Sequence, residues 1–375
     1  MNRISSLVDC FSWIEDPRIE RTRVHSLSDI LVLSVVAVIA GAEGWEDIEE
    51  FGKQKRSWLK KFLKLQAGIP SHDTINRVFR LLKPSVFQEA FLSWIKELHQ
   101  DLGLQTVAID GKSLRRSHDR KSMKQMLHSV SAWSTTNRMM LGQLAVDEKS
   151  NEITAIPELL KFLELEGAVV TMDAMGCQKT IAEQVVEQGG DYMLAVKDNQ
   201  PTLASAITEL FNEYHDAQSP ELVVRSHETK EKGHGRREHR MYFQAALSDS
   251  FVEQFPGWRG LKTVLQVMNV TEREGKETTD VRYYISSLPL GVKKAAKAIR
   301  NHWGIENSLH WVLDMTFNED QSRIRKDHGA ENFALLRRLA INIIQQDTSS
   351  GSIRKKRKRA AWNEDFLLNL IQQAA

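Results

Sequence analysis

Two aspartates stand where apolar segments of the sequence end. Asp110 follows the run Val107 to Ile109, Asp173 follows the run Ala168 to Met172, and a glycine comes within three residues of each. A charged side chain at the end of an apolar strand does not contribute to packing of the core. Ligands, by contrast, bind at the ends of strands in an open sheet. Both carboxylates are therefore candidate site residues.

A third acid, Glu306, lies between two histidines in a segment with helical apolar spacing. His302, Glu306 and His310 follow one another at four-residue intervals, which places them on one face of a helix. Two aspartates and a glutamate are hard oxygen donors that suit Mg²⁺. The alternatives are a zinc site formed by the two histidines and Glu306, which has no further strong ligand nearby, and ordinary caps or surface ions.

Basic residues cluster locally although the whole chain is nearly neutral. The 375 residues contain 51 Lys and Arg against 49 Asp and Glu. Six basic residues fall within each of the segments 52–64, 112–124 and 353–359. Three separated basic patches favour a polyanionic partner that crosses several parts of the fold, and the alternative for any one of them is a solvated helix face.

Length and composition exclude several classes of protein. The chain is long enough for two or three domains, and 41% hydrophobic with 27% charged residues is typical of a folded globular protein. The longest apolar run, Ile30 to Ala42, is shorter than a membrane span. Two cysteines, Cys10 and Cys177, exclude a disulfide framework and indicate a reducing compartment. With no apolar leader segment, we expect a cytoplasmic protein without a membrane partner.

The segment up to about residue 102 has the apolar spacing of helices. Within it, 55–66 is expected to form one helix, 67–70 a tight turn, and 71–82 a second helix with Ser71 as its N-cap. This outline is typical of a helix-turn-helix, whose second helix would present Asn76, Arg77 and Arg80 to DNA. Two packed helices with a polar face are an equal alternative. We expect residues 1–102 to fold alone.

From residue 105 the pattern changes to alternating strands and helices, which favours a mixed α/β sheet. Strands are expected at 106–109, 127–134, 139–146, 168–172 and 192–196, with helices at 155–165 and 179–188. Short strands between about 219 and 284 indicate a β-rich insertion, and long helices are expected at 292–313 and 330–344. The segment 346–375 is a basic C-terminal tail. Its polar part, from 345 to 359, is expected to be mobile, although 362–371 could form one more helix.

Several long motifs in order carry a resemblance to a known family. The runs 107–112, 171–174, 194–200 and 302–311 resemble those of DDE transposases of bacterial insertion sequences, in the branch that includes the H-repeat-associated proteins. The resemblance implies an RNase H-like catalytic core at 105–345 with the β-rich insertion inside it, after an all-helical N-terminal DNA-binding domain at 1–102 and before the basic tail. It implies a catalytic triad of Asp110, Asp173 and Glu306.

The activity implied by the resemblance is cleavage of insertion-sequence ends, followed by joining of the 3′ hydroxyl ends to target DNA. Two Mg²⁺ ions held by the triad would serve both steps, with Mn²⁺ as a substitute. Double-stranded DNA and a second copy of the chain, as a homodimer in the DNA complex, are the expected partners. A metal-dependent nuclease that does not join, and an inactive DNA-binding remnant, are the alternatives.

Further residues are expected to contact phosphates, and rivals exist for the third metal ligand. Relatives in the family carry tyrosine, arginine and lysine around the glutamate, where this chain has Ile299, His302 and Leu313. Asp314 and then Glu319 follow Glu306 in order of preference as ligand, and Trp258 is expected to pack in the core or to stack on a displaced base. The expected phosphate contacts are Lys112, Arg115, Arg116, Lys197, Gln200, Arg300 and His302.

Overall fold

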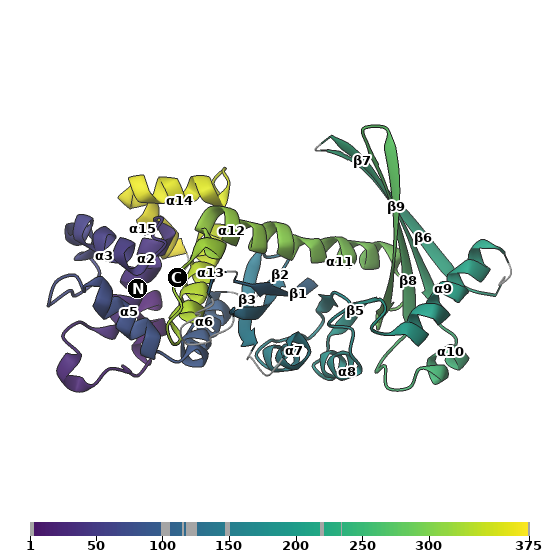
Figure 1. Ribbon diagram of the computed structural model, residues 1–375, viewed down its shortest axis with the longest axis horizontal. Coiled ribbons are helices and arrows are strands. Elements are labelled where there is room, and N and C mark those ends of the chain that lie inside the picture. The colour runs from purple at the N-terminus through teal and green to yellow at the C-terminus, as the bar shows by residue number, and fades with distance from the viewer. Residues whose placement is uncertain are drawn as a thin grey trace.

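A nine-stranded sheet runs from the middle to one end of an elongated molecule, and most of the helices gather at the other end (Figure 1). The computed structural model describes residues 4–98, 106–114, 116–117, 126–146, 151–217, 221–233 and 235–373. Strands run in the order β3-β2-β1-β4-β5-β9-β8-β7-β6. The expected mixed α/β architecture is confirmed.

Among the first five strands, two neighbouring pairs are parallel and the other pairs are antiparallel. β1 (Thr106–Ser113) pairs in parallel with β4 (Val169–Met172), which pairs in parallel with β5 (Asp191–Val196). β2 (His128–Ser134) and β3 (Met139–Val146) extend β1 as antiparallel neighbours. The predicted strands match closely, except that β1 continues past Asp110 to Ser113 because it pairs there with β2.

The β-rich segment extends the same sheet. Its four strands are β6 (Val224–Gly233), β7 (Arg236–Ala246), β8 (Thr263–Arg273) and β9 (Lys276–Ser286), and β9 pairs with β5. Trp258 is only 5% exposed and belongs to the hydrophobic core, so the core-packing interpretation is confirmed. The sequence reasoning did not anticipate α9 (Pro201–His215), whose Leu203, Ile207 and Phe211 are buried.

Helices cover the two faces of the sheet differently. The core on one face contains side chains from α7 (Glu152–Leu160), α8 (Lys179–Glu187) and α9, and α10 (Asp249–Gln254) adds Phe251 at its margin. On the other face α11 (Val292–Ile305) buries Ala295, Ala298 and Ile299 against strand residues such as Met193 and Leu265. After a π-helical turn, Glu306–His310, the same helix continues as α12 (Trp311–Phe317).

The described chain before β1 contains helices without strands. These are α1 (Ile4–Ser12), α2 (Leu27–Ile39), α3 (Trp45–Gln54), α4 (Arg56–Leu59), α5 (His72–Leu81) and α6 (Pro84–Leu98). α2 is buried nearly all round, as its continuous apolar sequence requires. Ser71 caps α5 by accepting the Thr74 N–H at 3.3 Å, as expected.

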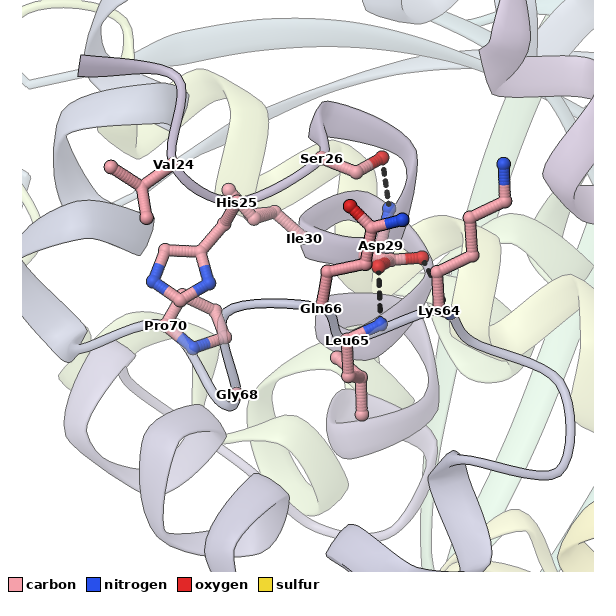
Figure 2. A pocket seen from close by; sticks show the side chains of 10 residues that line it. All are labelled: Val24, His25, Ser26, Asp29, Ile30, Lys64, Leu65, Gln66, Gly68 and Pro70. Carbon is pink, nitrogen blue, oxygen red and sulfur yellow. Dashed lines mark hydrogen bonds between the residues drawn. The ribbon is translucent and has the colours of Figure 1, made fainter. Parts of the chain in front are cut away.

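The helix expected at 55–66 is wrong. α4 ends at Leu59, and Leu65 adopts a left-handed backbone conformation with φ of 41°. The Asp29 carboxylate of α2 accepts the Leu65 N–H at 2.9 Å and so holds this loop in place (Figure 2). The cavity drawn there is a void of about 40 Å³ beside this contact. This hydrogen bond joins residues 36 positions apart, so the local sequence pattern did not reveal it.

The C-terminal helices share the core of the N-terminal ones. α13 (Gly329–Gln346), α14 (Ile353–Trp362) and α15 (Glu364–Gln373) pack with α1, α2 and α6 in one hydrophobic cluster. The expectation of a mobile tail is therefore wrong, although a helix near 362–371 is confirmed as α15. Residues 1–102 alone would expose much of this cluster, which argues against their folding independently.

One further contact joins this end of the molecule to the sheet. The Asn342 side chain of α13 bonds both the N–H and the carbonyl of Met140, at 2.9 Å each, and so caps the outer edge of β3.

Within the described part of the chain, no helix has the length and apolar character needed to cross a bilayer.

Candidate functional site

The two aspartates come together because their strands are adjacent and parallel. Ile109 of β1 and Met172 of β4 are register partners, so Asp110 and Asp173 follow at the same level of the sheet. Asp110 Oδ1 accepts the Gly111 N–H at 2.9 Å, and Asp173 Oδ1 accepts the Met175 N–H at 3.0 Å. Backbone donors therefore hold both carboxylates at the point where β4 ends.

Glu306 reaches the same cleft from a helix rather than a strand. It begins the π-helical turn, in which the Trp311 N–H donates to the Glu306 carbonyl, and the Asn307 amide donates to the Trp303 carbonyl at 3.2 Å. π-Helical turns of this kind are frequent at functional sites. Asp110, Asp173 and Glu306 all line one cleft of about 540 Å³, together with residues of β5, β9 and α9.

The electrostatics of this cleft centre on Asp110. Burial, together with repulsion from the carboxylates of Asp173, Glu306 and Glu152, raises the pKa of Asp110 to about 7. A cation between the acids would relieve this repulsion, and carboxylate oxygens are ligands suited to Mg²⁺. Among the described residues, however, no three acidic, His or Cys side chains are already gathered closely enough to hold a metal ion.

The two histidines do not form a zinc site with Glu306. His302 Nδ1 lies 3.0 Å from Thr171 Oγ1, and His310 Nδ1 lies 3.5 Å from Asp110 Oδ2. Burial, together with the nearby cations Lys112 and Arg338, lowers the pKa of His310 to about 3, so the ring is neutral at pH 7. Because the π-helical turn interrupts the four-residue spacing, the expected common face of 302, 306 and 310 is not kept.

The rivals for the third ligand have other partners. Asp314 accepts from Lys112 Nζ at 2.7 Å and 2.8 Å. Glu319 is fully buried and pairs with Arg338 at 2.7 Å and with Arg337 at 3.8 Å. The expectation that Lys112 meets phosphates is corrected here, because its side chain is only 8% exposed and is held by Asp314.

Of the other residues expected to contact phosphate, some are exposed and others already contact groups within the protein. Lys197 is exposed and lines the cleft, Arg116 is exposed in the segment after β1, and Arg115 lies outside the described residues. Gln200 instead donates to the Cys177 carbonyl at 3.0 Å, and His302 is mostly buried against Thr171. Arg300 pairs with Glu231 at 3.0 Å while remaining half exposed.

The helix expected to recognise DNA keeps part of its polar face exposed. Arg77 of α5 is exposed and Asn76 is half-buried. Arg80 instead pairs with Asp327 at 2.6 Å, which ties α5 to the loop before α13. His72 at the start of the helix pairs with Glu49 at 2.6 Å.

Sequence reasoning missed the contribution of the β-rich segment to the cleft. Asp280, Arg282 and Tyr284 of β9 line it, and the Arg282 guanidinium lies 4.8 Å from the Trp303 ring centre. These three residues also line a second cavity of about 290 Å³ between β7, β8, β9 and α11, which shares Trp303 and Glu306 with the first. The sequence did contain a signal for them: the three residues alternate along β9, which places their side chains on one face of the strand.

Comparison with known proteins identifies the family. Residues 101–343 match the model of the transposase DDE domain, and residues 8–95 match that of the DDE_Tnp_1-associated domain. The chain is 42% identical over 373 residues to "H repeat-associated putative transposase YhhI" of Escherichia coli K12, covering 98% of each. It is 41% identical over 374 residues to "Putative transposase YncI" of E. coli O157:H7, covering 98% of this chain and 95% of that protein.

Two further similarities are partial or remote. A segment covering 20% of this chain is 49% identical over 75 residues to "Inactive transposase YbfQ" of E. coli K12, of which it covers 89%. The piggyBac transposase in a synaptic complex with hairpin DNA matches at 12% identity with a TM-score of 0.41, over 99% of this chain and 77% of that one. That structural likeness is too remote to bear on function. The family models and the full-length relatives agree, and the chain belongs to the transposase DDE domain family.

Proposed function

We propose that the protein is a DNA transposase that cleaves the ends of an insertion sequence and joins the freed 3′ hydroxyl groups to target DNA. The observation that carries the proposal is the meeting of Asp110, Asp173 and Glu306 in one cleft, from three distant parts of the sequence. On this proposal, the five adjacent strands β3-β2-β1-β4-β5 form an RNase H-like core, with acids on β1 and after β4. Strands β6 to β9 are its insertion.

The three acids fit a pair of Mg²⁺ ions in donor type and in common location. The carboxylates of Asp110, Asp173 and Glu306 would together hold the two ions. When bound, the ions would stabilise the negative charge that develops on the attacking and leaving oxygens of a phosphodiester. Glu306 is exposed on the cleft wall, so its side chain has room to turn toward the aspartates as the site assembles.

Other residues of the chain would position the DNA. Lys197 is exposed in the same cleft as the acids and can contact a phosphate beside the scissile bond. The Thr171 hydroxyl orients His302 in the cleft lining, and Arg282 stacks on Trp303 nearby. Arg116, Arg300, Asn76 and Arg77 extend the candidate contact surface away from the acids, and recognition of the element ends is assigned to the helices before β1.

The test is cleavage of a labelled duplex that carries the DNA flanking the chain's own gene. We expect Mg²⁺-dependent nicking at the element end, no nicking in EDTA, and covalent transfer of the label to a target plasmid. Nicking without transfer would identify a nuclease instead. DNA binding without nicking would identify an inactive remnant.

A further inference from the structure

We propose that an acidic apolar groove between α9 and α10 receives helix α14 of a second copy of the chain. The groove has a volume of about 570 Å³ and lies on the side of α9 away from the catalytic cleft. Ala204 and Thr208 of α9 line the cleft, whereas Glu209, Leu210 and Glu213 line the groove. The groove is therefore separate from the proposed active site.

The lining of the groove is suited to a basic, partly apolar partner. It includes three glutamates and no Lys or Arg, and its apolar part comes from Leu210, Leu222, Leu247 and Phe251. Val223 at its edge is 56% exposed. An acidic rim repels nucleic acid, which favours a basic protein surface as the partner.

Helix α14 carries the complementary features on its outer face. Arg354, Lys358 and Trp362 recur every four residues, and none of them is buried, whereas Lys356, Arg357 and Ala360 on the inner side are buried. Trp362 is 79% exposed, a large apolar surface left uncovered beside two cations. The stripe is about 12 Å long at the rise of an α-helix.

The spacing of charges also matches. Glu209 and Glu213 lie one helical turn apart on α9, as Arg354 and Lys358 do on α14. With the two helices side by side, each cation meets a glutamate and Trp362 reaches the apolar part of the groove. Trp362 lies at the end of this stripe, beyond the two cations, and a tryptophan that becomes buried in a contact is a typical interface anchor.

The contact cannot form within one chain. α14 packs against α2, α12, α13 and α15 at one end of the long axis, and α9 and α10 lie at the other end (Figure 1). Two copies related by a twofold axis would each place α14 in the groove of the other, which closes the assembly as a dimer. Self-association of this kind does not depend on whether the protein cleaves DNA.

The test measures self-association of the full-length protein by sedimentation velocity without DNA or metal. We expect a monomer–dimer equilibrium whose dissociation constant rises about tenfold or more in Trp362→Ala, in Arg354→Glu/Lys358→Glu and in Glu209→Lys/Glu213→Lys. The matched control Lys60→Glu/Lys61→Glu alters net charge as much as the α14 variant does, on an exposed loop, and should dimerise as the wild type does.

A mixture of the two charge-reversed proteins makes the test specific and controls for misfolding. One contact in the mixed dimer has both native partners and the other has both charges exchanged, so mixing should restore dimerisation. Failure of the mixture to associate, a monomeric wild type, or unchanged association of Trp362→Ala would each overturn the proposal. Loss of DNA affinity in the α14 variant with unchanged self-association would likewise overturn it and assign α14 to DNA.

Discussion

Replacing Asp110 by asparagine is expected to stabilise the metal-free protein at high pH. Burial and the neighbouring carboxylates raise the pKa of Asp110 from 3.8 to about 7, so its ionisation in the folded state is unfavourable. An asparagine oxygen can accept the Gly111 N–H that Asp110 Oδ1 accepts at 2.9 Å. The substitution therefore removes the charge with little change in shape.

The size and sign of the effect follow from proton linkage. Because the folded-state pKa is above the unfolded one, the stability associated with protonated Asp110 is fully present below about pH 4 and is lost as the pH rises to 7. At about 1.4 kcal/mol per pKa unit, the loss approaches 4 kcal/mol above pH 7. The advantage of asparagine should thus grow by about 3 kcal/mol between pH 5 and pH 8.

The assay is denaturant unfolding of wild type and Asp110→Asn in EDTA at both pH values. Asp198→Asn is the matched control, because Asp198 lines the same cleft but is exposed. Adding Mg²⁺ at pH 8 should stabilise the wild type and narrow the difference. An asparagine variant that is no more stable at pH 8 than at pH 5, relative to wild type, would refute the role of charge repulsion in the cleft.

Three further predictions rest on other parts of the structure. Neutralising the exposed residues Arg56, Lys60 and Lys61 should lower the slope of log affinity for DNA against log salt by about 0.9 for each phosphate that the protein no longer neutralises, and an unchanged slope would make the patch a solvated surface. Gly111→Ala should destabilise the protein by about 0.5–1.5 kcal/mol in urea unfolding, because a Cβ there would displace the end of the Glu152 side chain from its hydrogen bond with His128. Glu319→Gln should cost about 3–5 kcal/mol by the same measurement, since Arg338 would remain buried without its counter-ion, and a decrease below about 1 kcal/mol would contradict this.

Most of the sheet was predictable from the sequence because strand signals are local. The apolar run before Asp173 is a buried strand, and its parallel pairing with β1 brings the two aspartates to one level. The position of Glu306 within a long helix was also predictable from its apolar spacing. The π-helical turn that begins at Glu306 was not, since it depends on how α11 and α12 pack on different parts of the core.

The errors share a physical cause, which is long-range partnership between polar groups. Lys112 is predicted to contact phosphate, but Asp314, about two hundred residues later, holds it instead. The loop after α4 depends on Asp29 of a preceding helix. The basic segment 353–359 is partly buried, with Arg357 bonded to the Val38 carbonyl at 3.0 Å. Such contacts leave no periodic trace in the sequence, so local pattern cannot reveal them.

Isosteric replacement in one cleavage assay tests most directly whether the three carboxylates act together on DNA. Asp110→Asn, Asp173→Asn and Glu306→Gln should each abolish Mg²⁺-dependent cleavage of element-end DNA while leaving its binding nearly unchanged. Asp314→Asn, which removes a nearby carboxylate that pairs with Lys112, should retain measurable cleavage. Wild-type cleavage by Glu306→Gln, with cleavage abolished by Asp314→Asn, would contradict the assignment of the third acid and with it the proposed active site.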